Sequence, residues 1–165
     1  MRGTARSLSK LADFDASPDV ADDAFLLAKV CVSHCPSIII NLRVLPAVID
    51  MALVGLHVQH GEACCSMLVF IRNTLQARDE LSVGVLQQVL PSRGAALAQS
   101  LLAGALGSLP TSRLEDVTDV LAAMLTCAGT TAVLWVQAAV IRVPDQAASA
   151  VGSHHLPRYL LASPF

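Results

Sequence analysis

The side chains best suited to metal chemistry lie in one short stretch, where His57 and His60 are followed by Cys64 and Cys65. Imidazole nitrogens and thiolates are common ligands of zinc, and a structural zinc site uses four of them. Adjacent cysteines, however, point about 100 degrees apart on a helix, and the usual spacings of zinc ligands are absent. We therefore predict that these cysteines are small buried apolar side chains, and that the chain holds no metal and no other cofactor.

Catalytic motifs are not recognisable in the chain. It contains no G-x-S-x-G, no P-loop and no H-E-x-x-H sequence. Ser153, His154 and His155 come closest to a hydrolytic set, but they lie in a segment without apolar periodicity, and no carboxylate can be assigned to them. We predict that the protein is not an enzyme.

Several charged side chains are candidates for protein binding, although a structural role is the simpler explanation for the acidic ones. Carboxylates in the first turns of a helix either complement the helix dipole or contact a basic partner. An arginine either stays solvated or pairs with a phosphate group, because a guanidinium can form two parallel hydrogen bonds with it. The candidate binding residues are the acidic Asp22, Asp23, Asp116 and Asp119 and the basic Arg72 and Arg78.

The composition predicts a helical protein that does not bind nucleic acid. Of the 165 residues, 54% are hydrophobic but only 4% are aromatic, which is unlike the aromatic and β-branched enrichment of sheets. A formal net charge of −2 provides no basic surface for DNA or RNA. The five cysteines are an odd number and no secretory signal opens the chain, so we expect reduced thiols inside the cell.

One hydrophobic stretch has to be tested against a membrane interpretation. Residues 121–141 carry no charge and are long enough to cross an apolar bilayer core of about 30 Å. Gly129 followed by Thr130 is typical of one helix ending and another beginning, so two shorter helices are favoured over one membrane span. A small membrane protein is kept as an alternative.

Apolar spacing predicts six main helices, the first two of which lie within residues 17–58. Ser17 is expected to cap the first helix, with Pro18 in its first turn. The second is expected to begin near Val44, after a short helical piece at 37–41. The predicted inward residues are Val20, Ala24, Leu27 and Cys31 in the first helix, and Leu45, Ile49, Ala52 and Leu56 in the second.

The third and fourth helices are expected at 62–78 and 81–106. The inward stripe of the third has the spacing i, i+3, i+4, i+7 and i+11, which places five apolar side chains on one helix face. The fourth should be kinked or divided at Pro91 and Gly94, because proline removes a backbone donor and glycine weakens a helix interior. The five residues of the stripe are Cys64, Met67, Leu68, Ile71 and Leu75.

The last two helices follow a predicted capping box, in which Ser112 and Glu115 satisfy each other's backbone donors. The sixth helix is expected to run from Thr131 to Arg142 and to stop at Pro144, before a short helix that ends near Val151. The inward face of the fifth helix is predicted to be Leu114, Val117, Leu121 and Met124.

The helix pairs recur at nearly regular intervals. They begin near residues 17 and 44, 62 and 81, and 112 and 131, close to the HEAT repeat length of about 40 to 47 residues. Each pair exposes too much apolar surface to stand alone, so stacking must supply the core. We predict an all-α fold, a HEAT-like solenoid fragment of about three antiparallel pairs at 17–151, with a flexible lead at 1–16 and an irregular tail at 152–165.

Three segments, in this order along the chain, carry a resemblance to a known family. They are residues 21–28, residues 60–75 with a His-x-x-Ala-x-Cys-Ser core, and the stretch from Leu109 to Leu121. They resemble the C-terminal repeats of the transportin-SR and importin-13-like branch of importin-β-type nuclear transport receptors. The resemblance covers residues 17–144.

The resemblance implies a function in protein import into the nucleus. Receptors of this kind carry protein cargo, including Ser/Arg-rich splicing factors, from the cytoplasm to the nucleus and release it when Ran-GTP binds. Their Ran-binding repeats lie upstream of the part that this chain resembles, so contact with cargo is the implied role here, without direct contact with nucleic acid or membrane. The six charged candidates are then candidate cargo contacts. A helical scaffold without transport function is the alternative.

Overall fold

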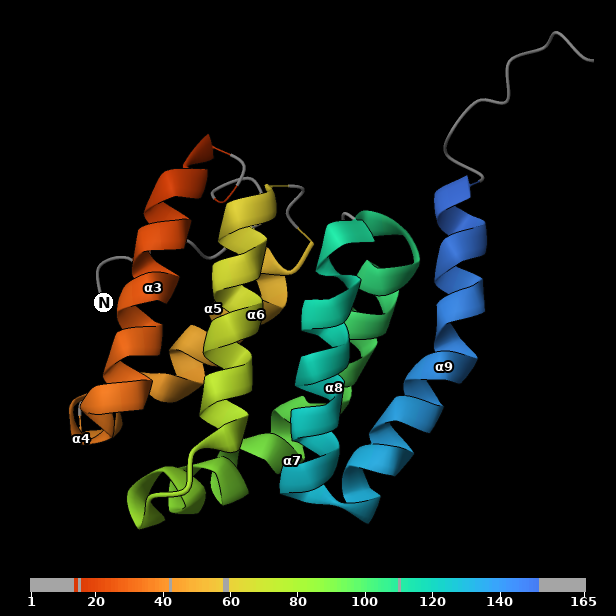
Figure 1. The fold of residues 1–165 in the computed structure, drawn as a ribbon. Coiled ribbons are helices and arrows are strands. Elements are labelled where there is room, and N and C mark those ends of the chain that lie inside the picture. Colours follow the sequence, from red (N-terminus) through yellow and green to blue (C-terminus); the bar gives the residue numbers. More distant parts are fainter. Residues whose placement is uncertain (1–13, 15, 42, 58–59, 110, 152–165) are drawn as a thin grey trace, which may run out of the picture.

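A computed structural model describes residues 14, 16–41, 43–57, 60–109 and 111–151. Within these ranges the chain forms helices joined by short turns and contains no strand. The helices lie in two layers, and the chain passes repeatedly from one layer to the other (Figure 1). The predicted all-α helical-repeat fold is therefore confirmed.

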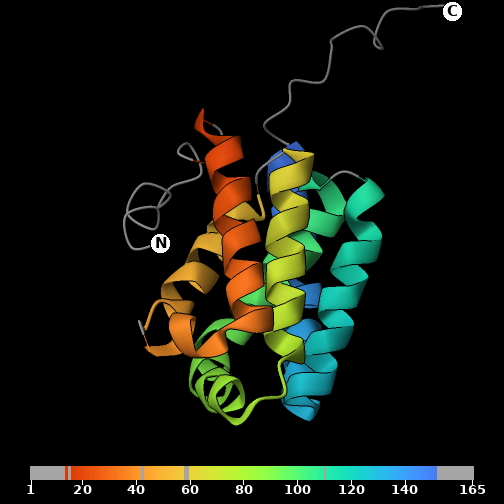
Figure 2. The same ribbon diagram turned by 60° about the vertical axis from the view of Figure 1, so that its left-hand side comes forward.

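The front layer consists of three helices, α3 (Pro18–His34), α6 (Gly61–Gln76) and α8 (Leu114–Ala128). The central α6 packs against α3 on one side and against α8 on the other. Figure 2 shows the three helices side by side, each beginning at the same end of the molecule. The starts of equivalent helices therefore lie along one edge, as expected for stacked repeats.

The rear layer contains the short α4 (Pro36–Asn41), α5 (Leu45–Gly55), α7 (Glu80–Ala103) and α9 (Thr130–Val151). Here α7 packs against α5 and, more extensively, against α9. A π-helical turn, η1 (Gly104–Ser108), and a 3-10 turn, η2 (Thr111–Arg113), lead from α7 back to the front layer. The helix α9 runs in the opposite direction to α8 (Figure 1).

The central helix α6 forms as the sequence predicts. Nδ1 of His60 accepts a hydrogen bond from the backbone N–H of Ala63 at 3.4 Å, and Glu62 lies in the first turn, where the helix dipole favours a negative charge. Its partner α3 contributes Phe25, whose ring centroid is 5.6 Å from that of Phe70. All five residues of the predicted stripe are buried, namely Cys64, Met67, Leu68, Ile71 and Leu75.

The inward face of α3 is not the predicted one. The side chains of Val20 and Leu27 are 50% and 52% exposed, while Ala24 and Cys31 are partly buried, because the buried face is turned by about 100° from the predicted one. The prediction failed because α3 is apolar on two faces, and periodicity alone cannot say which of them meets the neighbouring helix. The buried residues are Ala21, Phe25, Ala28 and Val32. The inward residues predicted for the second helix, by contrast, are all buried in α5 and the residue that follows it.

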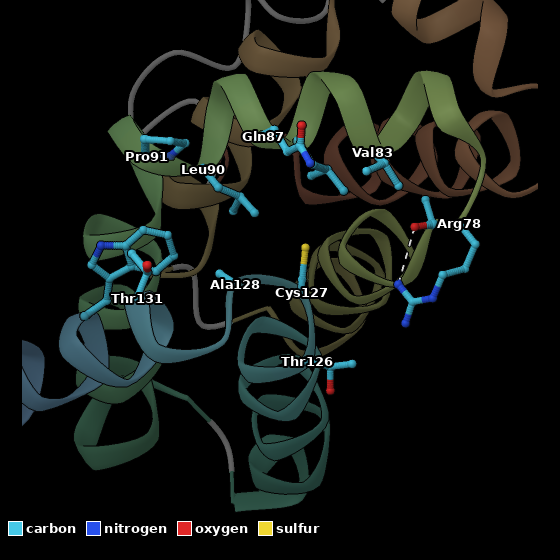
Figure 3. A pocket seen from close by; sticks show the side chains of 12 residues that line it. Arg78, Val83, Gln87, Leu90, Pro91, Thr126, Cys127, Ala128 and Thr131 are labelled. Atoms are coloured by element: carbon cyan, nitrogen blue, oxygen red, sulfur yellow. Dashed lines mark hydrogen bonds between the residues drawn. The ribbon is translucent and has the colours of Figure 1, made fainter.

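The fourth helix is bent but not divided. Asp79 caps α7 by accepting a hydrogen bond from the backbone N–H of Ser82 at 2.9 Å. The helix then continues through Pro91, where Figure 3 shows its direction changing. A Cβ atom on Gly94 would overlap the ring of Trp135 in α9. The bend at Pro91 and the missing side chain of Gly94 together allow α9 to approach α7 closely.

Two predictions about the last helices are wrong. Ser112 lies inside the 3-10 turn and is not a helix cap, since α8 begins at Leu114 without a side-chain cap. The predicted stop at Pro144 is absent, because α9 is helical from Thr130 to Val151 and accommodates the proline. Burial in α8 also differs in part from the prediction: Val117 and Met124 are buried, Leu121 is half-buried and Leu114 is 40% exposed.

The two ends of the chain fall largely outside the described residues. Of the predicted lead at 1–16, the structure describes only Phe14 and Ala16, and Phe14 is fully buried in the core. The predicted tail at 152–165 lies outside the described residues altogether, as do Ser153, His154 and His155.

Candidate functional site

The first two acidic candidates lie on neighbouring positions of α3 with different surroundings. Asp22 is half-buried and accepts a hydrogen bond from the hydroxyl group of Ser66 in α6. Asp23 is exposed, and no hydrogen bond or ion pair with another described side chain is recorded for it. Asp22 therefore joins two helices of the front layer, while Asp23 faces solvent and is accessible to a partner.

The other two acidic candidates, both in α8, form ion pairs. Asp116 pairs with Arg113, 3.1 Å away in the preceding turn, and this hydrogen bond raises the pKa of Arg113. Asp119 pairs with Arg72 of α6, with 2.8 Å between Nη1 and Oδ2. The side chain of Asp119 is nevertheless 49% exposed. It can therefore contact a partner while remaining paired within the stack.

The two arginine candidates also differ in accessibility, since one is paired within the stack and the other is exposed. Arg72 lies in the middle of the front layer and is held by Asp119 across the interface between α6 and α8. Arg78 lies in the turn after α6, is exposed, and donates a long hydrogen bond of 3.4 Å to the backbone carbonyl of Ala77. Phosphate or carboxylate binding is thus sterically simpler at Arg78 than at Arg72.

The rear layer contains an ion pair that the sequence analysis missed. Asp50 of α5 accepts hydrogen bonds from Nε and Nη2 of Arg93 in α7 at 2.6 and 2.7 Å, and these bonds raise the pKa of Arg93. The sequence separation of Asp50 and Arg93 is a signal that could have revealed this ion pair. Four side-chain contacts between repeats, including this one, join residues 40, 43, 44 or 47 positions apart, which is close to one repeat length.

The histidine and cysteine stretch has a structural role in the fold. His60 caps α6, and Cys64 is fully buried against the neighbouring helices. Burial raises the pKa of the Cys64 thiol to about 11, so it is uncharged near neutral pH. Among the described residues, no group of three or more histidine, cysteine or acidic side chains lies close enough together to hold a metal ion.

An open pocket of about 440 Å³ lies at the end of the molecule where α6 and α8 finish. Its walls come from the turn before α7, the first half of α7, the end of α8 and the start of α9 (Figure 3). Leu86, Leu90 and the Trp135 ring make it largely apolar, while Arg78 and Cys127 lie at its side. Desolvation raises the pKa of the Cys127 thiol. The sequence analysis did not identify this pocket, because four segments distant in sequence form it.

Apolar side chains are exposed at both ends of the stack. At one end, the outer face of α3 carries Val20, Leu27 and Val30, each about half exposed. At the other end, Leu134 and Ile141 of α9 are 63% and 76% exposed. Exposed apolar faces of this kind are typical of repeat units whose neighbours would cover them. Within the part of the chain that the structure describes, no helix has both the length and the apolar character needed to span a bilayer.

Comparison with known proteins shows a relative among transport receptors. The chain is 35% identical to Transportin MOS14 of Arabidopsis thaliana over 144 residues, which is 85% of this chain but only 15% of that protein. No protein-family model and no solved structure matches the chain. The similarity covers most of the chain, and a stack of helical repeats is the architecture that the structure shows. The chain is therefore related to one part of a transportin, a receptor of the importin-β type.

Proposed function

We propose that this chain acts as a segment of a nuclear import receptor. In this role it is a HEAT-like stack that contacts protein cargo during transport from the cytoplasm to the nucleus. The observation that carries the proposal is the 35% identity to Transportin MOS14 along 85% of the chain. The polar contacts one repeat length apart and the uncovered apolar faces at both ends support a place within a longer stack.

The cargo contact that we propose is the edge where the front helices begin. Asp23 is one of the accessible carboxylates there, and Asp119 adds another that is half exposed. Asp22 and Asp116 support the same edge, since their bonds to Ser66 and Arg113 fix its geometry. A cargo rich in arginine, such as a Ser/Arg-rich protein, has the complementary charge. Arg72 positions Asp119 in this account and does not itself bind cargo.

Titration of a fluorescent Arg/Ser-repeat peptide tests this contact. The affinity should fall as salt is added, because exposed ion pairs contribute only about 0 to 1 kcal/mol each and are screened by ions. The variant Asp23→Asn should bind the peptide more weakly than the wild type. Glu80→Gln is the matched control, since it removes an exposed carboxylate at the start of the rear helix α7.

Two results would contradict the proposed contact. One is equal affinity of the wild type and Asp23→Asn for the peptide, and the other is binding that salt does not weaken. A folded protein that binds no Arg/Ser peptide at all would favour the alternative function, a helical scaffold without a role in transport.

A further inference from the structure

The pocket beside Arg78 lies well away from the proposed acidic contact. In α8, Cys127 follows Asp119, the half-exposed carboxylate of that contact, by eight residues, which correspond to about 12 Å of helix. The two regions also have opposite charge, since the acidic edge favours basic ligands. Binding at the pocket is therefore a separate property, and either proposal can fail without the other.

The pocket has the size and lining of a binding site. Its volume of about 440 Å³ lies within the range of about 300 to 1,000 Å³ that is usual for ligand pockets. Val83, Leu90 and Trp135 provide apolar walls, and Figure 3 shows the Cys127 sulfur pointing towards α7 across the space between the helices. A large apolar side chain entering here would lose much of its contact with water.

The charge at the pocket is positive. Among the described residues that line it, Arg78 is the one permanently charged residue, and none is an aspartate or glutamate. The hydrogen bond to the Ala77 carbonyl uses one of the five N–H donors of the guanidinium (Figure 3). Desolvation keeps the Cys127 thiol protonated, so it adds no negative charge at neutral pH. An anionic group beside the apolar side chain would therefore be favoured.

We propose that this pocket binds a peptide segment of a partner protein in which a large apolar side chain is next to an anionic side chain. The apolar side chain enters the pocket, and the carboxylate or phosphate meets Arg78. A peptide is favoured over an enclosed small ligand because the rim is open. Gln87, Thr126 and Thr131 on that rim are exposed and provide hydrogen-bonding groups for a backbone that lies across it.

The test uses Cys127 as a reporter of occupancy. The full chain is alkylated with N-ethylmaleimide in the presence of short peptides, and the modification of each cysteine is followed by mass spectrometry. Four peptides share a central phenylalanine and differ in the next residue, which is glutamate, phosphoserine, glutamine or lysine. The exposed Cys35, which does not line the pocket, is the internal control.

The glutamate and phosphoserine peptides should slow the modification of Cys127 about fivefold more than the glutamine peptide, as expected for one exposed ion pair. Comparison of the two anionic peptides distinguishes a carboxylate from a phosphate as the preferred anion. Arg78→Gln should remove this difference, and Arg78→Glu should transfer the preference to the lysine peptide. Arg142→Gln, which removes an exposed arginine outside the pocket, should change nothing.

Any of four results would overturn the proposal. The first is protection of Cys127 that does not depend on the anion or on Arg78. The second is equal protection of Cys35. The third is a lack of protection by every peptide at about 1 mM, a concentration at which even a millimolar dissociation constant gives measurable occupancy. If 3-phenylpropionate protects Cys127 as well as the peptides do, the ligand is a small carboxylate and the assignment to a peptide is wrong.

Discussion

The two layers of the stack hold their helices together in different ways. In the front layer, α6 packs with buried side chains against both neighbouring helices, and the polar pairs Ser66–Asp22 and Arg72–Asp119 lie beside this packing. In the rear layer, α9 reaches α7 only because Gly94 leaves room for the Trp135 ring and α7 bends at Pro91. The front layer thus depends on ordinary amphipathic packing, and the rear layer depends on a few special residues.

The largest effect is expected in the front layer at Phe70. This side chain is fully buried and packs against Phe25 across the interface between α6 and α3. Phe70→Ala leaves a cavity, and we expect a loss of about 3 to 5 kcal/mol of unfolding free energy in urea denaturation. A loss below about 1 kcal/mol would show that the packing of α6 against α3 does not stabilise the stack.

The second largest effect is expected in the rear layer, where alanine replaces one or the other of two glycines in α7. Gly94→Ala places a methyl group against the Trp135 ring, and overpacking of this kind costs about 1 to 3 kcal/mol. Gly84→Ala meets no neighbouring atom within 4 Å and should stabilise α7 by up to about 1 kcal/mol. Thermal unfolding of both variants measures the contrast. Equal stabilisation by the two substitutions would show that α9 does not approach α7 as described.

A smaller effect is expected for the ion pairs of the two layers, whose coupling free energies can be measured by double-mutant cycles. Arg93 holds both carboxylate oxygens of Asp50, whereas Arg72 makes one contact with Asp119. All four side chains are partly exposed, so each coupling should be about 0 to 1 kcal/mol and should fall with added salt. We expect the larger coupling for the Arg93 pair, because two parallel hydrogen bonds fix its geometry. A larger coupling for the Arg72 pair would reverse this ranking.

The last effect appears only at alkaline pH. Burial raises the pKa of Cys64 from an ordinary value of 9.0 to about 11, so the folded state favours the protonated thiol. The Cys64 thiol ionises at a lower pH in the unfolded chain than in the folded protein. The unfolding free energy should therefore fall as the pH rises from about 9 to about 11. Below pH 9 this residue should contribute no pH dependence. Cys64→Ala should flatten this part of the profile, and an unchanged slope in the variant would assign it to other groups.

The sequence predicted the core positions of two helices correctly. The stripe of α6 and the inward face of α5 are buried as expected, although burial in α6 extends past the stripe to Ala63 and Phe70. The same reasoning failed for α3, which has two apolar faces. In a repeat stack both faces of a helix can meet a neighbour, so periodicity identifies the helix but does not identify its inward side.

Local rules for helix ends were less dependable than periodicity. Ser112 and Glu115 have the spacing of a capping box, yet Arg113 pairs with Asp116 and α8 begins after a 3-10 turn. Pro144 was expected to end a helix that in fact continues. At neither place does the chain follow the local preference for a helix end.

The candidate site was predictable only in its residue types. Position along a helix indicated acidic groups at the helix starts, but it could not show that Asp119 is paired with Arg72 while Asp23 is exposed. These partners lie about one repeat apart in sequence. The pocket beside Arg78 was beyond prediction, because it depends on how four separate segments meet.

The central claim is that this chain serves as a cargo-contacting segment of a transport receptor. The most direct measurement replaces the matching 15% of Transportin MOS14 with this chain and follows import of a reporter fused to a cargo of the parent receptor into nuclei of permeabilised cells. We predict that the chimera accumulates the reporter as the parent protein does, while a receptor lacking the segment does not. A chimera that is folded and monomeric, yet imports no more reporter than the deletion, would contradict the claim.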